Sequence, residues 1–432
     1  MPDTAPAELI LTVEKPVAGG RMIARHDGRV VLVSGAIPGE RVRARVERTS
    51  RGVTQAAAIE VLDASPDRRS VAEARPCGGN LYAHIRPDRQ VSLKAEILAD
   101  ALVRIGRLPV AAPIPVTASP EPGYRTRARL HARGGSLGFF REGSHDLCDP
   151  ASTGQLLPET CLFAERLALA LRVSHLDEVD AVEVAENVPA SERVAHLSLT
   201  REVEPGRLAP VARVEGLTGL VSGPAQAADA IRLRLHAGVP YVVDALAVAA
   251  PDGCIHRVVL RHHVLSFFQA NRHLLTTLAA RVVGLAGDGP VADLYAGAGL
   301  FALSLAASGR TRIVAVEGDR FSAADLRANA AAFEGAIDVL RMPVEQFAAE
   351  AQLPGGTTVI VDPPRTGMSR EAMNGILALG AERIVYVSCD VATFARDLGR
   401  LVQSGFRLGR IEAFDLFPNT PHVEGLAVLT RP

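Results

Sequence analysis

The chain has no tryptophan, and Lys15 and Lys94 are its only lysines. Its formal net charge is −1, so the molecule as a whole does not attract a polyanion, and any such partner has to be held by local patches of arginine. The five cysteines show no pairing pattern, and the sequence has neither an apolar N-terminal segment nor an apolar run of transmembrane length. We therefore expect a reduced, cytoplasmic protein that makes no membrane contact.

Length and composition favour several folded domains. A chain of 432 residues corresponds to roughly three domains of about 100–200 residues each, and a hydrophobic content of 48% is ample for packed cores. Strand and turn patterns predict a small all-β module over residues 1–62, a central α/β region over residues 63–260 and an α/β domain over residues 261–432.

Residues 291–302 predict a strand that turns through glycines into a helix. Gly297 and Gly299 let the backbone turn tightly beside a ligand, and the start of the helix offers unpaired N–H groups. The next predicted strand, residues 312–317, ends in Glu317, at roughly the spacing of a carboxylate that binds ribose hydroxyls. The pattern satisfies Gly-x-Gly-x-x-Ala, so a dinucleotide and S-adenosylmethionine (SAM) are both candidate ligands on this evidence.

Two later strand ends carry chemically useful side chains. The β-branched run at residues 357–361 precedes Asp362-Pro363-Pro364, whose prolines can neither extend a strand ladder nor continue a helix and so hold Asp362 at the sheet edge. Residues 385–388 form another strand pattern, which ends at Cys389. Taken alone, most free cysteines are buried core residues. At the carboxyl edge of an open α/β sheet, however, Cys389 is a candidate nucleophile.

In this order, the four motifs resemble a class I SAM-dependent methyltransferase, and specifically the family of RNA uracil-5-methyltransferases. Residues 263–271 contain Phe-Phe-Gln-Ala-Asn, similar to the family's Phe-Phe-Gln-x-Asn, and residues 417–424 end in its His-Val-Glu motif. The resemblance covers about residues 260–432 and implies a Rossmann-like fold. It implies Cys389 as nucleophile, Glu424 as base, and SAM bound by Gln269, Tyr295, Gly297, Gly299, Glu317 and Asp362.

The chemistry of uracil gives an independent reason for a cysteine and a carboxylate. Carbon 5 is too weakly nucleophilic to take a methyl group from SAM unless a thiolate first adds to carbon 6. A base must then remove the carbon 5 proton before the thiolate can leave. The chain departs from the family in having Val391 two residues after the nucleophile, where proline is common, and Leu300, where some members place an asparagine that touches SAM.

Other functions compete with this one. An RNA cytosine-5-methyltransferase usually has a second cysteine directly after the proline of its Asp-x-Pro motif, and an amino-methyltransferase has an aromatic residue after Asp-Pro-Pro. Arg365 occupies that position here and argues against both. A catalytically silent RNA-binding protein is disfavoured by the presence of both Cys389 and Glu424.

The N-terminal module resembles a TRAM domain, an OB-like RNA-binding barrel often fused to these enzymes. Strand patterns at residues 9–14, 29–33 and 41–46 are separated by glycine-rich turns. Arg41, Arg43 and Arg45 alternate with apolar residues, so they share one strand face that can contact phosphates.

The central region resembles the part of the family that holds RNA. Arg125, Arg127 and Arg129 alternate in the same way, while residues 172–260 predict strands that serve as scaffold or recognise RNA shape. Family members for 23S rRNA carry an iron–sulfur cluster on four cysteines here. Only Cys77 and Cys161 match that pattern, since Val71 and Asn80 replace two ligands, and we expect neither a cluster nor another metal.

The family analogy also bears on partners. A barrel at the N-terminus favours 23S rRNA over tRNA as substrate, although the sequence does not say which uridine is modified. We expect a monomer.

Overall fold

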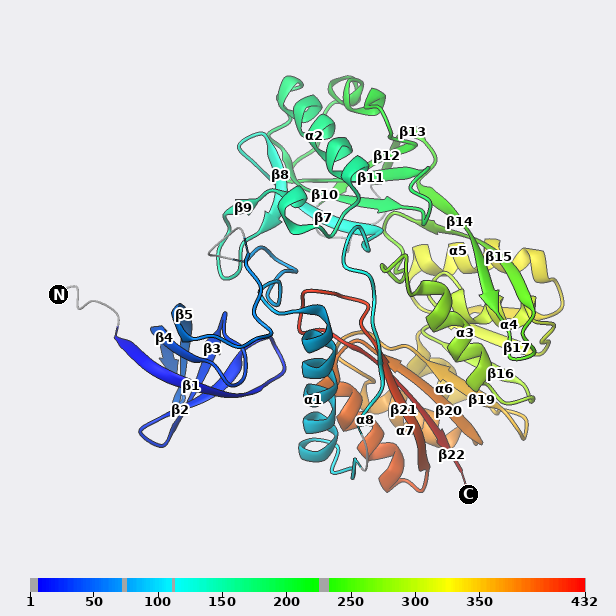
Figure 1. Ribbon diagram of the computed structural model, residues 1–432. Helices are drawn as coiled ribbons and strands as arrows, with labels where there is room; N and C mark the ends of the chain where they lie inside the picture. The colour runs from blue at the N-terminus through cyan, green and yellow to red at the C-terminus, as the bar shows by residue number, and fades with distance from the viewer. Residues whose placement is uncertain (1–6, 72–75, 111–112, 225–232, 432) are drawn as a thin grey trace.

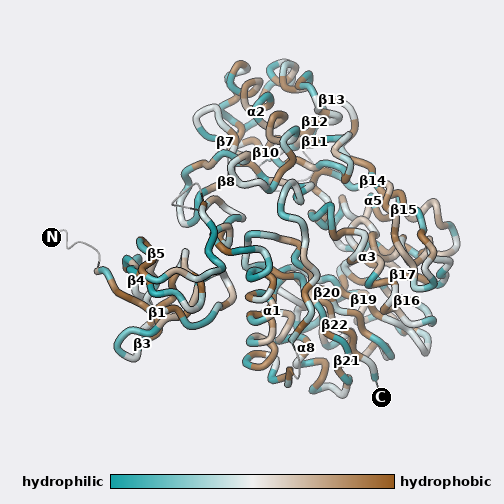
Figure 2. Tube along the Cα trace, in the orientation of Figure 1, coloured by the Kyte–Doolittle hydropathy of each residue, from teal (hydrophilic) through white to brown (hydrophobic). Residues whose placement is uncertain are grey.

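The computed structural model describes residues 7–71, 76–110, 113–224 and 233–431. They form a small barrel, a central sheet and a larger C-terminal sheet covered by helices (Figure 1). Figure 2 shows apolar residues concentrated along the strands of the C-terminal sheet, while the helices mix apolar and polar residues. The predicted α/β class, with an OB-like barrel before a Rossmann-like domain, is confirmed.

The barrel is closed, with strand order β1-β2-β3-β5-β4. The three strands expected from the sequence lie within β1, β3 and β4, while β2 and β5 complete the closure. Tyr82, Ile85 and Leu93, from the segment that follows the barrel, pack into its core, so the barrel does not complete its core alone. The strands are β1 (Glu8–Pro16), β2 (Met22–His26), β3 (Arg29–Ser34), β4 (Arg41–Ser50) and β5 (Val53–Asp63).

The central sheet has the order β13-β12-β11-β10-β7-β8-β9, and α2 (Pro158–Val173) packs on one face of it. Phe163 and Leu167 of α2 lie against Val182 and Leu197 of the sheet. The strands are β7 (Arg127–Arg133), β8 (Ser136–Phe140), β9 (Leu147–Cys148), β10 (Val179–Glu186), β11 (Arg193–Leu199), β12 (Gly219–Pro224) and β13 (Arg234–Gly238); short 3-10 turns are η1 (Pro150–Thr153), η2 (Pro205–Leu208) and η3 (Val211–Arg213).

The C-terminal sheet has the order β18-β17-β16-β19-β20-β22-β21-β6 and is parallel from β18 to β20. Its strands are β16 (Val291–Leu294), β17 (Ile313–Glu317), β18 (Ile337–Arg341), β19 (Thr358–Val361), β20 (Arg383–Ser388), β21 (Arg407–Phe414) and β22 (Glu424–Thr430). Its helices are α3 (Leu275–Leu285), α4 (Leu300–Ala307), α5 (Arg320–Ala330), α6 (Val344–Glu350), α7 (Arg370–Ala378) and α8 (Val391–Gln403), with a 3-10 turn η5 (Ala331–Phe333).

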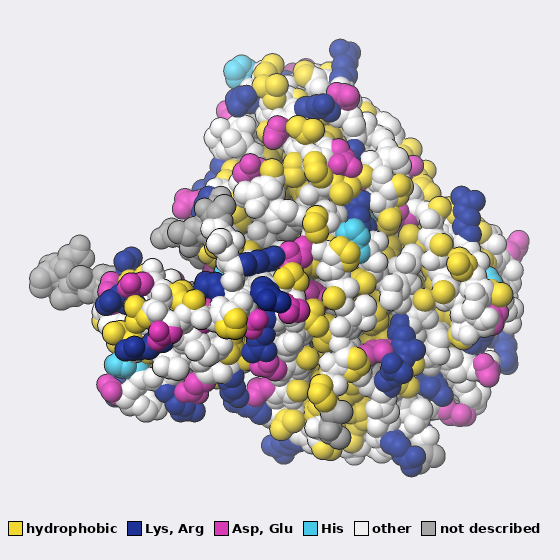
Figure 3. Space-filling model, viewed as in Figure 1, with side chains coloured by type: hydrophobic (Ala, Val, Ile, Leu, Met, Phe, Trp, Pro, Cys, Tyr) yellow, Lys and Arg dark blue, Asp and Glu magenta, His cyan; other side chains and the backbone are white. Residues whose placement is uncertain are grey.

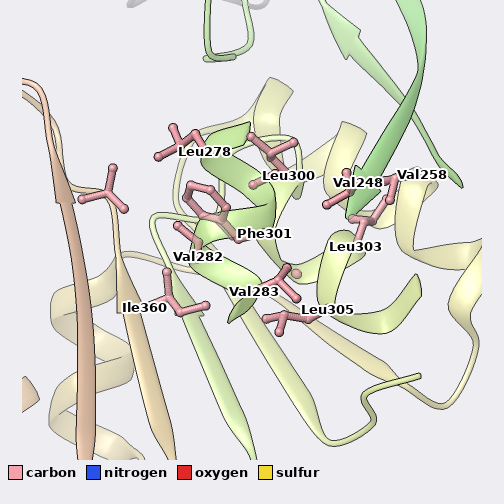
Figure 4. Close-up of a cluster of buried hydrophobic side chains, with 14 of the residues drawn as sticks. Val248, Val258, Leu278, Val282, Val283, Leu300, Phe301, Leu303, Leu305 and Ile360 are labelled. Carbon is pink, nitrogen blue, oxygen red and sulfur yellow. The ribbon is translucent and has the colours of Figure 1, made fainter. Parts of the chain in front are cut away.

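Helices cover both faces of this sheet. On one face, Leu278 of α3 and Phe301 of α4 lie over Ile360 of β19, joined by Val248 and Val258 from a hairpin (Figure 4). The hairpin consists of β14 (Tyr241–Ala249) and β15 (Ile255–His263). Within the described ranges, no helix is long and apolar enough to cross a membrane.

Parts of residues 63–260 join the C-terminal sheet. The strand β6 (Val116–Thr117) pairs with β21, and α1 (Pro87–Arg104) packs through Leu98 and Leu102 into the core beneath α8. Because these contacts cross the predicted limits of the domains, the domain boundaries at residues 62 and 260 stay a prediction.

Candidate active site

The strand order reverses between β16 and β19, and ligands of open α/β sheets bind at such a switch point. The loop after β16 turns here with positive φ at Tyr295 (61°), Gly297 (58°) and Gly299 (101°). A Cβ atom on Gly299 would lie 2.3 Å from Cδ1 of Leu303, so this position requires glycine for both its φ and its packing.

Several of the predicted cofactor residues line one cavity at this point. It occupies about 300 Å³ including its mouth. Its walls are apolar with a few polar groups, as is usual for small-molecule sites. The lining residues are Phe267, Phe268, Gln269, Tyr295, Ala296, Gly297, Ala298, Leu300, Phe301 and Asp362.

Glu317 lies behind the glycine loop at the end of β17. Its Oε2 accepts from the Gly297 N–H at 2.7 Å and its Oε1 from the Asp319 N–H at 2.7 Å. Burial raises the pKa of this carboxyl, and these backbone donors oppose the rise. Because a carboxylate can accept about four hydrogen bonds, Glu317 retains capacity for ribose hydroxyls. The residues present therefore fit SAM.

Gln269 and Asp362 meet in the lining of the cavity. The Gln269 amide donates to Asp362 Oδ2 at 3.1 Å. Burial raises the pKa of Asp362 to about 7, while the bond from Gln269 lowers it and the charge of Glu317 raises it. Burial therefore favours the protonated form of Asp362.

Strand pairing brings Cys389 and Glu424 together. Cys389 directly follows β20, Glu424 begins β22, and the antiparallel register pairs Ser388 with Gly425. Continued by one residue, this register sets Cys389 opposite Glu424, and the charge of Glu424 acts on the Cys389 thiol. Glu424 is 1% exposed, and its Oε1 has no hydrogen-bond partner among the described residues.

Burial dominates the electrostatics of this pair. It raises the pKa of the Cys389 thiol to about 12, helped by the charges of Glu424 and Asp362. It also raises the pKa of Glu424 well above its usual value, with Asp362 as the next cause. Burial therefore favours the protonated form of both groups.

Arg365 is a functional candidate that the sequence reasoning missed. Its charge lowers the pKa of both Cys389 and Glu424, and its side chain hydrogen-bonds to Cys389. The Thr393 hydroxyl, in the first turn of α8, donates to the Arg365 carbonyl at 3.3 Å and holds this loop beside the nucleophile. The signal in the sequence is its place directly after Asp-Pro-Pro.

Asp293 was also missed. It is fully buried in β16, and its Oδ2 accepts from the Ala302 N–H of α4 at 3.0 Å. Burial raises its pKa to about 8. An acid within an apolar strand next to a glycine loop is the signal that would have revealed this anchor of the turn.

The two departures from the family motifs have structural counterparts. Val391 begins α8, and Asp390 caps this helix by accepting from the Ala392 and Thr393 N–H groups at 3.1 and 2.9 Å. The cap therefore orders the turn that a proline would have stiffened. Leu300 lines the cofactor cavity as an apolar wall.

The expectation of unpaired cysteines was wrong. Cys77 and Cys148 form a disulfide that closes 71 residues of chain, and Cys161 lies in the same buried cluster. The pairing depends on β9, which lies far from Cys77 in sequence, so spacing could not reveal it. In the described part of the chain, no group of three His, Cys, Asp or Glu residues could hold a metal ion.

A cavity at the switch point, an acid behind a glycine loop and a strand-end cysteine define a SAM-dependent methyltransferase. The model of the tRNA (uracil-5-)-methyltransferase family matches residues 355–432. The chain is 34% identical to the 23S rRNA (uracil(1939)-C(5))-methyltransferase RlmD of Alkalilimnicola ehrlichii, covering 95% of this chain and 94% of the relative. It is also 32% identical to the protein of that name in Pseudomonas entomophila, over 97% of this chain and 92% of the relative. The chain therefore belongs to the family of RNA uracil-5-methyltransferases.

A solved structure has the same overall fold. It is the Pyrococcus abyssi tRNA (uracil-54, C5)-methyltransferase in complex with S-adenosyl-L-homocysteine. The TM-score is 0.75 at 24% identity, and the match covers 97% of this chain and 99% of that chain. The likeness extends over barrel, central sheet and C-terminal sheet alike.

Proposed function

We propose that this enzyme transfers a methyl group from SAM to carbon 5 of a uridine in 23S rRNA through a covalent adduct with Cys389. The observation that carries the proposal is the strand register that sets Cys389 opposite Glu424 beside the cofactor cavity. The relatives named for 23S rRNA support the substrate.

The reaction proceeds in three steps. Cys389 loses its proton to solvent, its thiolate adds to carbon 6 of uracil, and the electron pair of the 5,6 double bond moves toward the carbon 4 oxygen. Carbon 5 then forms a bond to the methyl group, which SAM supplies as it becomes S-adenosylhomocysteine. Glu424 removes the carbon 5 proton, the double bond re-forms and the thiolate leaves.

Charge balance explains the arrangement around the base. Arg365 compensates the thiolate and the enolate-like oxygen, both of which develop in a buried site. Gln269 and Asp362 orient the methionine end of SAM and the target base, Tyr295 and the glycine loop with Gly297 and Gly299 enclose the cofactor, and Glu317 binds its ribose.

Two variants test the chemistry. Cys389→Ala should bind SAM normally, by calorimetry, and form no 5-methyluridine, because the thiolate activates carbon 5 and does not hold the cofactor. Glu424→Gln should accumulate an RNA–protein adduct that survives denaturation, since proton removal follows methyl transfer. Turnover of Cys389→Ala near the wild-type rate would refute the covalent route.

Mapping of 5-methyluridine in rRNA and tRNA from a strain that lacks the gene tests the substrate. Loss of one 23S rRNA position, restored by the wild-type gene and not by Cys389→Ala, is the expected result. Loss confined to tRNA would contradict the assignment to rRNA.

The substrate also bears on location and assembly. We infer that the enzyme works in the cytoplasm, where rRNA is processed, and acts as a monomer, because one chain supplies the cofactor cavity, the nucleophile and the base.

A further inference from the structure

The open face of the central sheet carries a group of aromatic and basic side chains that the proposed chemistry does not use. Side chains alternate along a strand, so Ala128 and Leu130 of β7 pack under α2 while His131 and Arg133 lie on the opposite face. His131 stacks on Phe140 of β8, with ring centroids 3.6 Å apart and planes 10° apart. His145 meets Phe140 edge-on at 5.2 Å. We call His131, Arg133, Phe140 and His145 the stacking cluster.

The stacking cluster is accessible. His131 and Phe140 are half-buried, and Arg133 and His145 are exposed. In the β7–β8 pairing His131 lies opposite Gly138, which has no side chain to separate the two rings. The Arg133 guanidinium lies 5.4 Å from the Phe140 ring centroid, and within the described ranges it forms no ion pair.

Burial and the charges around the cluster favour the neutral form of His131. Burial lowers its pKa, the charges of Arg129, Arg133 and His145 add to this effect, and Asp180 opposes it. Glu183 is engaged with Arg129 at 2.9 Å. The face therefore combines flat neutral rings with an available cation, as surfaces that stack unpaired nucleobases do.

Its position relates the cluster to the active site. The segment that leads into β7 contacts the residues that follow Gln269 of the cofactor cavity. The Thr126 N–H donates to the Ala270 carbonyl at 2.8 Å, and Arg125 forms an isolated β-bridge with Asn271. His131 lies five residues beyond Thr126 along the strand, so the two residues are about 16 Å apart at ~3.3 Å per residue. In Figure 1, α2 covers the other face of this sheet. The cluster is too far away to hold the base that is methylated, yet within reach of its neighbours.

We propose that the stacking cluster binds an unpaired nucleobase of the substrate RNA a few nucleotides away from the methylated uridine. The choice of RNA as partner rests on the proposed function. The rings of His131 and Phe140 provide the stacking surface, and Arg133 contacts the adjoining phosphate.

Binding of a single-stranded oligoribonucleotide that contains the target uridine tests this, measured by fluorescence anisotropy at several salt concentrations. Phe140→Ala should weaken binding by about 5- to 100-fold without changing the salt dependence, because stacking releases no counterions. The matched variant Phe140→Tyr keeps the ring and should bind within about twofold of wild type. Arg133→Ala should instead reduce the salt slope by about 0.7.

Wild-type affinity in both Phe140→Ala and His131→Ala would overturn the proposal, and so would a loss that Phe140→Tyr shares. SAM affinity, measured on the same preparations by calorimetry, should be unchanged in all variants and reports that they are folded. If the wild type bound the oligonucleotide but methylated no RNA, the proposed function would fail while the binding comparison still decided the role of the cluster.

Discussion

At the scale of single residues, the active site is governed by desolvation. Cys389, Glu424 and Asp362 all have raised pKa values because each is withdrawn from water, and each carboxylate raises the pKa of its neighbours further. Arg365 is the cation that opposes this effect at both Cys389 and Glu424. Thiolate formation therefore depends on Arg365 as well as on pH.

Alkylation of Cys389 by iodoacetamide should reveal this control. Below a pKa of about 12 the thiolate fraction rises tenfold per pH unit, so the alkylation rate of Cys389 should rise tenfold per unit between pH 7 and 10. Arg365→Met removes the opposing charge and raises the pKa further, so the rate at any pH in this range should fall several-fold. Mass spectrometry of the Cys389 peptide measures it.

Cys254 provides an internal control for this experiment. It is exposed, and its pKa is raised by the hydrogen bond and charge of Asp252 with no contribution from Arg365. Its alkylation rate should be the same in both proteins. An equal rate for Cys389 in wild type and Arg365→Met would show that Arg365 does not stabilise the thiolate.

At the scale of elements, the turn from β16 into α4 depends on one glycine. Gly299→Ala would place a methyl group against Leu303 and Leu326 in a backbone conformation that side chains rarely adopt. We expect a loss of about 2–4 kcal/mol in the free energy of unfolding from strain and overpacking, together with weaker SAM binding. Urea unfolding and calorimetry measure these effects.

Gly309, just beyond the other end of α4, is the matched control. Its φ is also positive, at 87°, but an added Cβ would meet no atom within 4 Å. Gly309→Ala should cost about 1 kcal/mol and leave SAM affinity unchanged. Equal losses of unfolding free energy in the two variants would show that the contacts at Gly299 do not contribute to stability.

A buried ion pair connects α1 to the segment that leads to Glu424. Lys94 is fully buried and bonds to Asp415, and its Nζ also donates to the Phe417 carbonyl at 2.9 Å. Lys94→Met would leave the Asp415 charge buried without its cation and should destabilise the protein by about 3–5 kcal/mol. Lys94→Met with Asp415→Leu should recover much of this loss in thermal unfolding. A double variant no more stable than Lys94→Met would contradict the pairing argument.

At the scale of the whole molecule, the barrel is joined to the rest through a shared core. Deleting residues 1–62 would expose Tyr82, Ile85 and Leu93, so substitution is the better test of the barrel's role in RNA binding. Basic side chains gather where the barrel meets the region around α1 (Figure 3). Arg43 is paired with Glu60 at 2.8 Å and Arg41 lies 3.9 Å from Asp63, so part of the predicted basic face is already neutralised.

Replacing Arg41, Arg43 and Arg45 together by alanine should weaken RNA binding and reduce the salt slope by up to about 2, at about 0.7 per lost phosphate contact. The methylated position should not change, because phosphate contacts carry no base identity. Affinity as a function of salt, with 5-methyluridine mapping, measures both. Methylation of another uridine would mean that the barrel selects the site.

Local sequence patterns were enough to predict several elements of this protein. Alternating apolar residues predicted three barrel strands, β-branched runs predicted β17, β19 and β20, and the glycine loop followed by Glu317 predicted the cofactor edge, because these patterns arise from backbone conformation and burial over a few residues. Family motifs then named Cys389 and Glu424.

Features that need distant segments to meet could be read from the folded structure alone. The register of β20 and β22 sets Cys389 opposite Glu424, the fold of the Asp-Pro-Pro loop brings Arg365 to both, and β9 brings Cys148 to Cys77. The same holds for β6 and α1, which belong to the central stretch of the sequence but pack in the C-terminal domain. Such contacts are fixed by packing and strand pairing between residues tens to hundreds of positions apart, and local sequence patterns carry no information about them.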